Sequence, residues 1–360
     1  MNRAASSPYM EWAKTRTRAR FDLARSGVPD QPLAALEATL ADVEIDGGGG
    51  YGWAPLLAAL GAHLGRPQDE IVHLPGTSMA NFVALAGLLS PGDDVLVERP
   101  TYELLVSAAR FLGANVVRFD RRFTDGYAVD PSAVSAAMTP RTKLVVLTNL
   151  HNPSSARIPD ATLHALGSLA REAGARVLVD EVYLEALYET PTPTARRLDP
   201  ELLVTSSLTK AWGFSGLRCG WIAAEPDLAR RFARLNDLFG VVHARPAETL
   251  ALRALARLPA LAPGLRELLA KNRNAFSEFL AGRTDLEAVV PPDGTVVFPR
   301  LKHGSSDELC RMLRETYETT VVPGSFFGDD RAFRVALSIP PDDLCEGLAR
   351  LGQALDSLGG

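Results

Sequence analysis

The sequence lacks the features that tie a protein to a membrane or to an oxidising compartment. No apolar run approaches the roughly 20 residues that span a bilayer, and residues 1–10 hold no apolar stretch of signal-peptide length. The only three cysteines, Cys219, Cys310 and Cys345, lie far apart without CxxC spacing. We therefore expect free thiols, no disulfide framework and no metal site. Together these absences predict a cytoplasmic protein.

Clusters of positive charge are also missing. The net charge is -5, and no segment is rich in Lys and Arg in the way that nucleic acid or an anionic membrane surface requires of a partner. Hydrophobic residues make up 46% of the chain and charged residues 22%, close to the average for a soluble globular protein. By elimination, the composition favours small-molecule chemistry, with no nucleic acid and no membrane as partner.

What the sequence does contain is an alternation of β-branched runs and Ala/Leu-rich stretches of helical length between Ile71 and Ala223. Short β-branched runs separated by helices predict a buried, mostly parallel sheet flanked by helices, which is the α/β class. We predict seven strands, which begin at Ile71, Asp94, Asn115, Leu144, Arg176, Leu202 and Cys219.

The rest of the chain predicts a second, smaller unit. From about Glu225 the sequence is mainly helical through Leu280, and short strand candidates follow. These candidates are residues 294–301, 320–322 and 333–338. Because 360 residues exceed the usual size of one hydrophobic core, we expect two domains. The predicted division is an N-terminal segment packing on the small domain (1–45), a large cofactor-binding domain (46–240) and a small C-terminal domain (241–360).

Two features of the N-terminal region have ordinary structural interpretations. Tyr9 and Trp12 lie in a leading amphipathic helix, and core packing is the favoured interpretation of both. The stretch from Gly47 to Trp53 holds too many glycines for the interior of a helix or strand, so it predicts a loop that leads to a helix at Pro55.

Candidate functional residues follow the predicted strands, because ligands of a parallel α/β sheet bind outside the carboxyl ends of its strands. After the first strand, Thr77 and Ser78 open a helix, which suits a phosphate but equally suits an ordinary helix N-cap. After the fourth, Asn152 precedes a proline that restricts it to extended backbone, although Asn-Pro is also a common turn.

The next two strand ends carry charged residues. Asp180 ends the fifth strand, where a buried carboxylate needs a cationic partner, either a pyridinium N–H or an arginine. After the sixth come Ser207, Thr209, Lys210 and Arg218 among glycines, which predicts an anion-binding loop that contains an amine. A lysine in such a loop forms Schiff bases once neighbouring positive charge lowers its pKa. A lone lysine would instead be interpreted as a surface residue.

Taken jointly, these motifs resemble the class I/II, fold-type I aminotransferases of the aspartate aminotransferase superfamily. That family has a phosphate-binding turn, an aromatic residue, Asn-Pro, Asp-x-x-Tyr, Ser-x-x-Lys and a late arginine, and all six occur here in the same order over nearly the whole chain. Asp180 precedes Lys210 by 30 residues and Lys210 precedes Arg218 by eight, both of which are typical of the family. The resemblance implies pyridoxal 5'-phosphate as cofactor, a homodimer, and transfer of an amino group between an L-amino acid and a 2-oxo acid.

The resemblance also implies roles for individual residues. Lys210 is similar to the Schiff-base lysine that moves the substrate proton, and Asp180 to the carboxylate that keeps the pyridine nitrogen protonated. Asn152 and Tyr183 match the groups that hydrogen-bond the ring hydroxyl. Tyr102 occupies the position of the aromatic residue that stacks on the ring. The catalytic set is therefore Lys210, Asp180 and Tyr183.

The remaining site residues concern the phosphate and the substrate. The phosphate-binding residues implied by the resemblance are Thr77, Ser78, Ser207, Thr209 and Arg218. Arg334 matches the arginine that binds the substrate α-carboxylate, although alone it would be interpreted as a surface arginine at the end of a strand. Gly27 resembles the N-terminal segment that closes over the substrate, and Asn152 is also placed at the substrate.

Three positions depart from the family pattern. Gly47 stands where the family usually has a tyrosine that reaches the phosphate of the neighbouring subunit, and Tyr51 is displaced by four residues. The turn that reads Asn-Pro-Thr-Gly in the family has Ser155 in place of glycine. Ser78 stands where some aspartate aminotransferases have a lysine that binds the side-chain carboxylate, which argues against a dicarboxylate substrate.

Other functions are less favoured. Another fold-type I reaction on an amino acid, such as that of a C–S lyase, a cyclase or an oxidase, is the main alternative, because sequence does not show which substrate bond lies perpendicular to the ring. A transcription regulator that uses this fold would need a basic DNA-binding module before the glycine-rich loop. A nicotinamide dehydrogenase would need Gly-x-Gly-x-x-Gly after the first strand, and residues 75–80 lack that motif.

Overall fold

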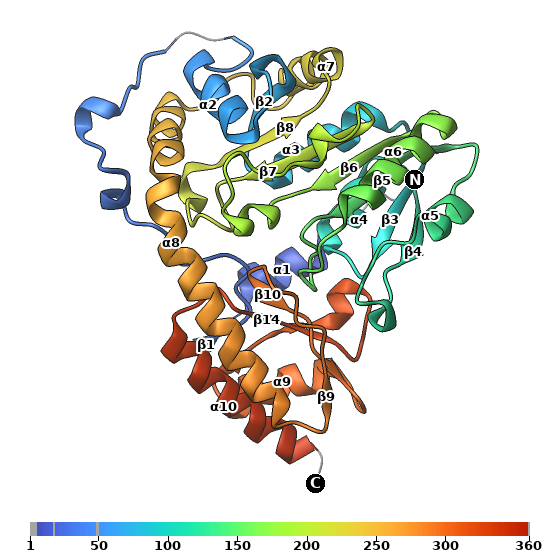
Figure 1. The fold of residues 1–360 in the computed structure, drawn as a ribbon, viewed down its shortest axis with the longest axis vertical. Coiled ribbons are helices and arrows are strands. Elements are labelled where there is room, and N and C mark those ends of the chain that lie inside the picture. The colour runs from blue at the N-terminus through green and yellow to red at the C-terminus, as the bar shows by residue number, and fades with distance from the viewer. Residues whose placement is uncertain (1–5, 17–18, 48–49, 359–360) are drawn as a thin grey trace.

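A computed structural model describes residues 6–16, 19–47 and 50–358, and it confirms the α/β class. A seven-stranded sheet with helices on both faces lies above a smaller unit in Figure 1. The strand order is β2-β8-β7-β6-β5-β3-β4, with β8 antiparallel to both neighbours and the other pairs parallel. All seven predicted strands are present: β2 (Ile71–Pro75), β3 (Asp94–Arg99), β4 (Asn115–Asp120), β5 (Thr142–Thr148), β6 (Arg176–Asp180), β7 (Leu202–Ser207) and β8 (Cys219–Ala223).

The sheet is buried on both faces because successive side chains of a strand point to opposite sides. In β3, Val95 and Val97 join one apolar cluster while Leu96 joins the other. Residues of α3, α4 and α7 complete the first cluster, and residues of α2, α6 and the later helix α8 (Arg245–Ala281) belong to the second. The helices of this region are α2 (Ala54–Leu64), α3 (Thr77–Leu88), α4 (Glu103–Phe111), α5 (Pro131–Ala137), α6 (Asp160–Ala173) and α7 (Pro226–Asn236).

The smaller unit is built around the long helix α8, which runs down one side of the whole molecule (Figure 1). Two of the predicted strands are each split in two. Residues 294–301 form β10 and β11, separated by Phe298 and Pro299, because a proline has no N–H to continue a ladder. The elements are α8 (Arg245–Ala281), β9 (Leu286–Glu287), β10 (Val296–Val297), β11 (Arg300–Leu301), α9 (Ser306–Thr316), β12 (Thr319–Thr320), β13 (Val322–Pro323), β14 (Phe333–Ala336) and α10 (Pro341–Leu358).

The N-terminal residues lie between the two units. Helix α1 (Pro8–Thr15) begins next to α4, where the Ser7 hydroxyl hydrogen-bonds the Glu103 carboxylate. Strand β1 (Phe21–Asp22) then pairs in parallel with β12, and the Leu23 carbonyl accepts a hydrogen bond from the Ala336 amide (2.8 Å). This segment therefore contacts both units, with α1 at the junction (Figure 1).

Several connections are 3-10 helices. They are η1 (Leu33–Leu36), η2 (Leu40–Asp42), η3 (Gln68–Glu70), η4 (Phe123–Asp125), η5 (Leu184–Leu187), η6 (Ala195–Arg197), η7 (Ser215–Leu217) and η8 (Gly324–Phe327). The predicted glycine-rich loop does precede α2, but Gly48 and Gly49 lie outside the described residues. All three cysteines are free, and among the described residues no helix is both long and apolar enough to cross a bilayer.

Candidate active site

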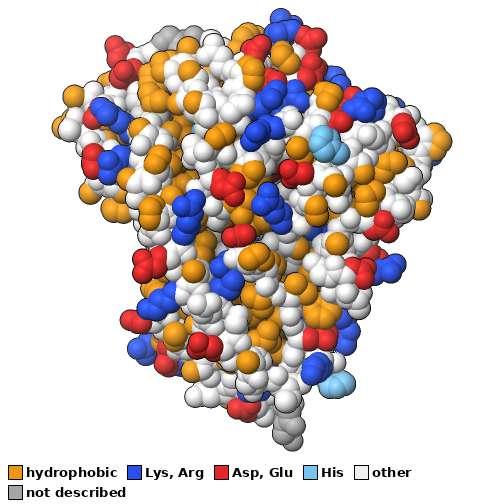
Figure 2. Space-filling model, in the orientation of Figure 1, with side chains coloured by type: hydrophobic (Ala, Val, Ile, Leu, Met, Phe, Trp, Pro, Cys, Tyr) orange, Lys and Arg blue, Asp and Glu red, His pale blue; other side chains and the backbone are white. Residues whose placement is uncertain are grey.

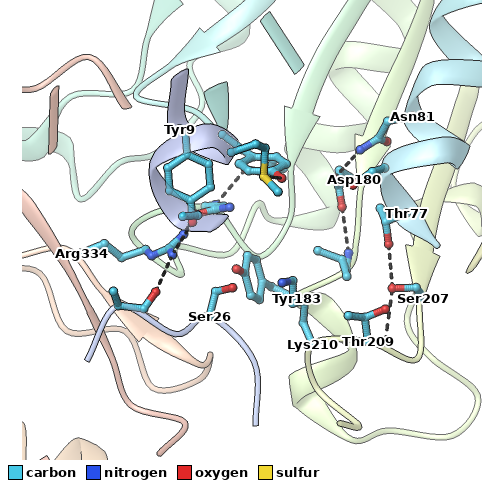
Figure 3. Close-up of a pocket in the computed structure, with 18 of the residues that line it drawn as sticks. Tyr9, Ser26, Thr77, Asn81, Asp180, Tyr183, Ser207, Thr209, Lys210 and Arg334 are labelled. Atoms are coloured by element: carbon cyan, nitrogen blue, oxygen red, sulfur yellow. Dashed lines mark hydrogen bonds between the residues drawn. The ribbon is translucent and has the colours of Figure 1, made fainter. Parts of the chain in front are cut away.

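A cavity of about 320 Å³ lies where the carboxyl ends of the parallel strands face α1 and β14. Figure 3 shows the cavity residues in two groups, with Asp180 and Lys210 on one side and Arg334 and Tyr9 on the other. Every residue predicted from the sequence for the site lines this cavity except Gly27. The lining residues are Tyr9, Met10, Ala13, Ala24, Ser26, Thr77, Ser78, Asn81, Tyr102, Thr148, Asn152, Asp180, Val182, Tyr183, Ser207, Thr209, Lys210, Arg218 and Arg334.

Lys210 follows the end of β7 by three residues, in a loop that is fixed on its far side. The indole Nε1 of Trp212 donates to the Glu185 carboxylate (2.8 Å), and the Tyr188 hydroxyl donates to the Ala211 carbonyl (3.0 Å). Burial and the nearby Arg334 guanidinium lower the pKa of the Lys210 amine to about 8. A substantial neutral fraction near physiological pH makes this amine a nucleophile.

Asp180 is the last residue of β6, and its carboxylate is buried. One oxygen accepts a hydrogen bond from Asn81 Nδ2 (2.7 Å) and the other accepts one from the Val182 amide (3.1 Å). Burial nevertheless raises the pKa of Asp180 to about 6. None of the arginines in the described part of the chain forms an ion pair with it, so the carboxylate is free to pair with a cationic ligand.

Asn81 is a site residue that the sequence predictions missed. Its Oδ1 accepts a hydrogen bond from the Thr205 hydroxyl (2.5 Å), which orients its amide N–H toward Asp180. Asn81 lies four residues after Thr77 in α3, so both side chains are on the same face of that helix. The available signal was a lone amide inside the apolar stretch from Ala80 to Leu88.

Hydroxyl groups gather where α3 begins beside the Lys210 loop. Thr77 Oγ1 donates to Ser207 Oγ (2.8 Å), and the Thr209 amide donates to the same oxygen (3.3 Å). The N-cap residue of α3 is Gly76, which has no side chain to cap the helix. The amides of the first turn, including Ser78, therefore have no intrahelical acceptor and are available to an anion.

Arg218 lies across Gly76. Its Nη2 donates to the Pro75 carbonyl (3.0 Å) and its Nη1 to the Ser215 carbonyl (3.2 Å). A side chain at residue 76 would occupy the space of this guanidinium, and the φ of Gly76 is +90°, which other residues rarely adopt. Glycine at this position therefore brings the arginine to the start of α3, where it adds positive charge to the hydroxyl cluster.

Arg334, on β14, is a buried cation with no acidic partner among the described residues. Its Nη1 donates to Asn152 Oδ1 (3.0 Å), and its Nη2 donates to the Tyr9 hydroxyl (3.0 Å) and to the Ala24 carbonyl (3.3 Å). Its Nε has no hydrogen-bond partner among the residues that the structure describes. A buried guanidinium held only by neutral oxygens is a site for an anion, since an unpaired buried charge is costly.

Asn152 is itself held in place from below the cavity. The backbone amide of Asn152 donates to the Thr148 hydroxyl (2.9 Å), and that hydroxyl donates to the Glu98 carboxylate (2.5 Å). Glu98 forms a fully buried ion pair with Arg121 (2.8 Å). This chain of contacts fixes the position of the side chain that contacts Arg334.

Three tyrosines, Tyr9, Tyr102 and Tyr183, also line the cavity. Burial raises the pKa of the Tyr183 hydroxyl to about 12, although Arg334 and a hydrogen bond with Ser26 oppose that rise. The Tyr102 hydroxyl donates to Met10 Sδ (3.2 Å), and the Tyr102 ring meets the Tyr9 ring edge-on at 5.7 Å. The core-packing interpretation of Tyr9 is right about its burial, at 7% exposure, but it missed that the hydroxyl reaches Arg334.

Gly27 does not line the cavity, so its predicted role at the substrate stays a prediction. A Cβ at residue 27 would lie 2.8 Å from the Lys210 carbonyl oxygen, and the Val28 amide donates to that same oxygen (2.8 Å). Glycine is therefore required for the N-terminal segment to lie on the backbone of the lysine loop. The residues of this segment that do face the cavity are Ala24 and Ser26.

The departures from the family pattern also have a structural account. Ser155 adopts a φ of +63°, the conformation that glycine usually supplies, and its hydroxyl donates to the Val296 carbonyl (2.7 Å). Tyr51 is 59% exposed, and its hydroxyl donates to Asp237 (3.2 Å), so it does not line the cavity of its own chain. Gly47 lies against the Arg245 guanidinium.

Comparison with known proteins agrees with this geometry. The profile of the family Aminotransferase class I and II matches residues 31–351. The chain is 29% identical to capreomycidine synthase of Streptomyces vinaceus, over 97% of this chain and 94% of that one. It is 30% identical to arginine–pyruvate transaminase of Pseudomonas aeruginosa, over 79% of this chain and 74% of that one. A solved tetra mutant of Thermus thermophilus aspartate aminotransferase matches with a TM-score of 0.84 at 26% identity, covering 93% of this chain and 96% of that one.

A family profile that spans nearly the whole chain, together with a relative of 30% identity, establishes the family. The chain belongs to the class I and II aminotransferases, which makes it a pyridoxal-phosphate-dependent enzyme that transfers an amino group between an amino acid and a 2-oxo acid.

Proposed function

We propose that the cavity binds pyridoxal phosphate through Lys210, with Asp180 at the pyridine nitrogen. Asp180 forms no ion pair with a described residue, and a protonated pyridine N–H beside it would lower the pKa that burial has raised. The first turn of α3 and Arg218 would hold the phosphate together with three hydroxyls, those of Thr77, Ser207 and Thr209. When bound, the cofactor supplies an electron sink for the substrate carbon.

The other side of the cavity would hold the substrate. Arg334 would bind the α-carboxylate, with Asn152 between the carboxylate and the cofactor hydroxyl. Tyr183 would donate to the same cofactor hydroxyl, since a pKa of about 12 keeps it protonated. Lys210, once released as a free amine, would carry the proton away from the substrate Cα, because its pKa of about 8 suits transfer in both directions.

The observation that carries this proposal is that the buried Asp180 carboxylate and Arg334 guanidinium, neither of which forms an ion pair with a described residue, line one cavity with a reactive amine. An absorbance spectrum of the purified protein tests it. We expect a band near the edge of the visible region from the lysine linkage, which Lys210→Ala abolishes and which the exposed control Lys271→Ala keeps. Wild-type protein that binds no pyridoxal phosphate would refute the assignment.

A second candidate function is another reaction of the same cofactor, such as that of a cyclase. It is favoured by the fact that capreomycidine synthase matches 97% of this chain, whereas the arginine–pyruvate transaminase matches 79%. Turnover with pyruvate or 2-oxoglutarate separates the two functions. A product that forms from the amino acid at the same rate without any 2-oxo acid would favour the second candidate.

We also propose that the enzyme is a homodimer. Large apolar side chains are exposed on two segments, residues 33–51 and 237–242. A hydrogen bond between Tyr51 and Asp237 joins the two segments. Hydrophobic side chains gather on the upper left of Figure 2, over the part of the molecule where Figure 1 places the N-terminal segment and α2. An exposed patch of this kind indicates a protein contact. The residues are Leu33, Leu40, Ile45, Tyr51, Leu238, Phe239, Val241 and Val242.

Light scattering at micromolar concentration tests the dimer. We expect twice the mass of the chain for wild-type protein, and half that value for a double variant, Leu238→Asp with Val241→Asp. A monomeric wild type would refute the proposal.

We propose that the chain divides into an N-terminal segment (1–45), a large domain (46–240) and a small domain (241–360). Limited proteolysis near residue 240 tests this division. The cytoplasmic location is a further proposal.

A further inference from the structure

The substrate side of the cavity has an apolar wall made largely by α1. Tyr9, Met10 and Ala13 line the cavity, while Glu11 and Lys14 are exposed and do not line it. Tyr9 and Ala13 share a face of the helix because they are four residues apart. The cavity face of α1 therefore presents an aromatic ring, a thioether and a methyl group. Figure 3 shows this helix on the side of Arg334, opposite Asn81 and Thr77.

This wall is held firmly in place. The Met10 sulfur accepts a hydrogen bond from the Tyr102 hydroxyl (3.2 Å), and the Tyr9 hydroxyl accepts one from Arg334 (3.0 Å). Ser7, at the start of the helix, hydrogen-bonds Glu103 on α4. Tyr9 also packs in an apolar cluster with Ala24 and side chains of the smaller unit. The wall is thus a fixed surface that a ligand side chain must match.

The charged groups of the cavity lining are already committed. Arg218 is held at the start of α3, Lys210 is the reactive amine, and Arg334 lies against Asn152. Among the described lining residues the only carboxylate is that of Asp180, and both of its oxygens accept hydrogen bonds within the protein. Asp30 acts on Lys210 from outside the lining, where its carboxylate accepts from Ser215 (2.6 Å).

Among the described residues of this chain, no opposite charge at the wall would therefore face a second charge on the substrate. Removing a carboxylate or guanidinium from water against a thioether and methyl groups is strongly unfavourable without a partner. An apolar side chain gains free energy in the same place, since it leaves water for the surface of Met10, Ala13 and Tyr102.

We propose that the amino-acid substrate carries an uncharged, mainly apolar side chain, of the kind found in leucine, methionine or phenylalanine, which packs on Met10, Ala13 and Tyr102. The proposal rests on the proposed function for one point, the binding of the α-carboxylate to Arg334. It sets this enzyme apart from two relatives whose names specify charged amino acids, arginine and aspartate.

Equilibrium binding of unreactive acids tests this proposal without turnover. Calorimetry on the holoenzyme would compare 4-methylpentanoate with succinate and with 5-guanidinopentanoate, three acids that differ in the charge of the distal group. We expect 4-methylpentanoate to bind about 30-fold more tightly than either of the others, in line with the discrimination that apolar pockets achieve. Equal or tighter binding of a charged acid would overturn the proposal.

Variants of the wall sharpen this test. Met10→Ala should weaken binding of 4-methylpentanoate about 10-fold and leave that of acetate unchanged, because acetate does not reach the wall. Ala13→Leu, which narrows the cavity, should weaken 4-methylpentanoate but not acetate. Lys14→Ala, at an exposed residue of α1 that does not line the cavity, is the matched control and should bind both acids as the wild type does. If both wall variants keep the wild-type affinity for 4-methylpentanoate, the wall does not contact the ligand and the proposal fails.

A screen of amino donors with 2-oxoglutarate distinguishes this proposal from the proposed function. Turnover that is fastest with arginine or aspartate would refute the apolar subsite and leave aminotransfer intact. Absence of turnover with every donor, combined with tight binding of 4-methylpentanoate, would refute the assigned reaction and leave the apolar subsite intact.

Discussion

The two sides of the cavity are assembled in different ways. On the proposed cofactor side, Asp180 ends β6 and Lys210 follows the neighbouring strand β7, so a parallel sheet brings them together by its topology alone. On the substrate side, Tyr9 and Arg334 are 325 residues apart and come from α1 and β14. The difference explains why short motifs predict a cofactor site more readily than a substrate site. The motifs of the cofactor site all follow strands of one repeated strand–helix pattern.

The two sides also differ in the sign of the charge that they leave unmatched. Among the described residues, the Asp180 carboxylate on the proposed cofactor side and the Arg334 guanidinium on the proposed substrate side are both buried without an ion-pair partner. Among the described residues neither group neutralises the other. A ligand with a cationic ring would pair with the carboxylate, and a substrate carboxylate would pair with the guanidinium. Binding would therefore offset the free-energy cost of burying these two charges without ion-pair partners.

The largest effect is expected on the substrate side. Arg334→Leu should lower kcat/KM about 1000-fold, because the carboxylate loses its charged partner and Asn152 loses its donor. Steady-state kinetics measure the loss, and the exposed control Arg110→Leu should retain wild-type kinetics. The cofactor absorbance should stay at the wild-type level. If the variant loses cofactor as well as substrate affinity, the two sides are not independent.

The next effect concerns the cofactor side and stability. In cofactor-free protein the pKa of Asp180 is raised from 3.8 to about 6, so its ionised form opposes folding once the pH exceeds the unfolded value. At pH 8 the free energy of unfolding of Asp180→Asn should therefore exceed that of wild type by about 3 kcal/mol, and the variant should unfold at a higher urea concentration. The difference should shrink as the pH falls through 6 and vanish below about 4. The exposed control Asp69→Asn should show no such dependence, and a wild type more stable than Asp180→Asn at pH 8 would contradict the expectation.

A smaller effect is expected at Asn81, which acts through Asp180. Asn81→Ala removes a hydrogen bond that favours the ionised carboxylate, so the pKa of Asp180 should rise further and kcat should fall about 30-fold. The acid limb of the pH profile should move to higher pH, which a purely structural role would not produce. Asn274→Ala, exposed on α8, is the control. An unchanged acid limb would mean that Asn81 does not position the carboxylate.

The smallest effect is expected at Tyr9. Tyr9→Phe keeps the ring against Tyr102 but removes the oxygen that accepts from Arg334, so KM should rise about fivefold, or roughly 1 kcal/mol, with kcat unchanged. Tyr317→Phe removes a hydroxyl far from the cavity and should leave KM alone. A fall in kcat instead of a rise in KM would place Tyr9 on the cofactor side.

The same contrast explains how much could be predicted from the sequence. Six of the seven strands of the sheet were recognisable because each is an apolar run buried on both faces, whereas the edge strand β4 is largely half-buried. The resemblance then pointed to the residues at the strand ends. Tyr9 was assigned to the core because burial of a tyrosine ring is ordinary, and nothing local reveals that its hydroxyl meets a guanidinium 325 residues away. Asn81 was missed because its function depends on two other strands.

Short elements of the smaller unit were also beyond prediction. Strands β1 and β9 have two residues each, too few for an alternating pattern. β1 pairs with β12 near the other end of the chain, and β9 pairs with β11. The turn at Ser155 illustrates another limit. A serine adopts the left-handed conformation there because its hydroxyl bonds the Val296 carbonyl, a contact that belongs to a different part of the chain.

The separation between Tyr9 and Arg334 also has a consequence for biosynthesis. A ribosome adds roughly 5 to 20 residues per second, so about 15 to 65 s pass between the synthesis of α1 and that of its partner on β14. The strand ends that would carry the cofactor are made well before that moment. A nascent chain could therefore acquire its cofactor side while it is still unable to select a substrate.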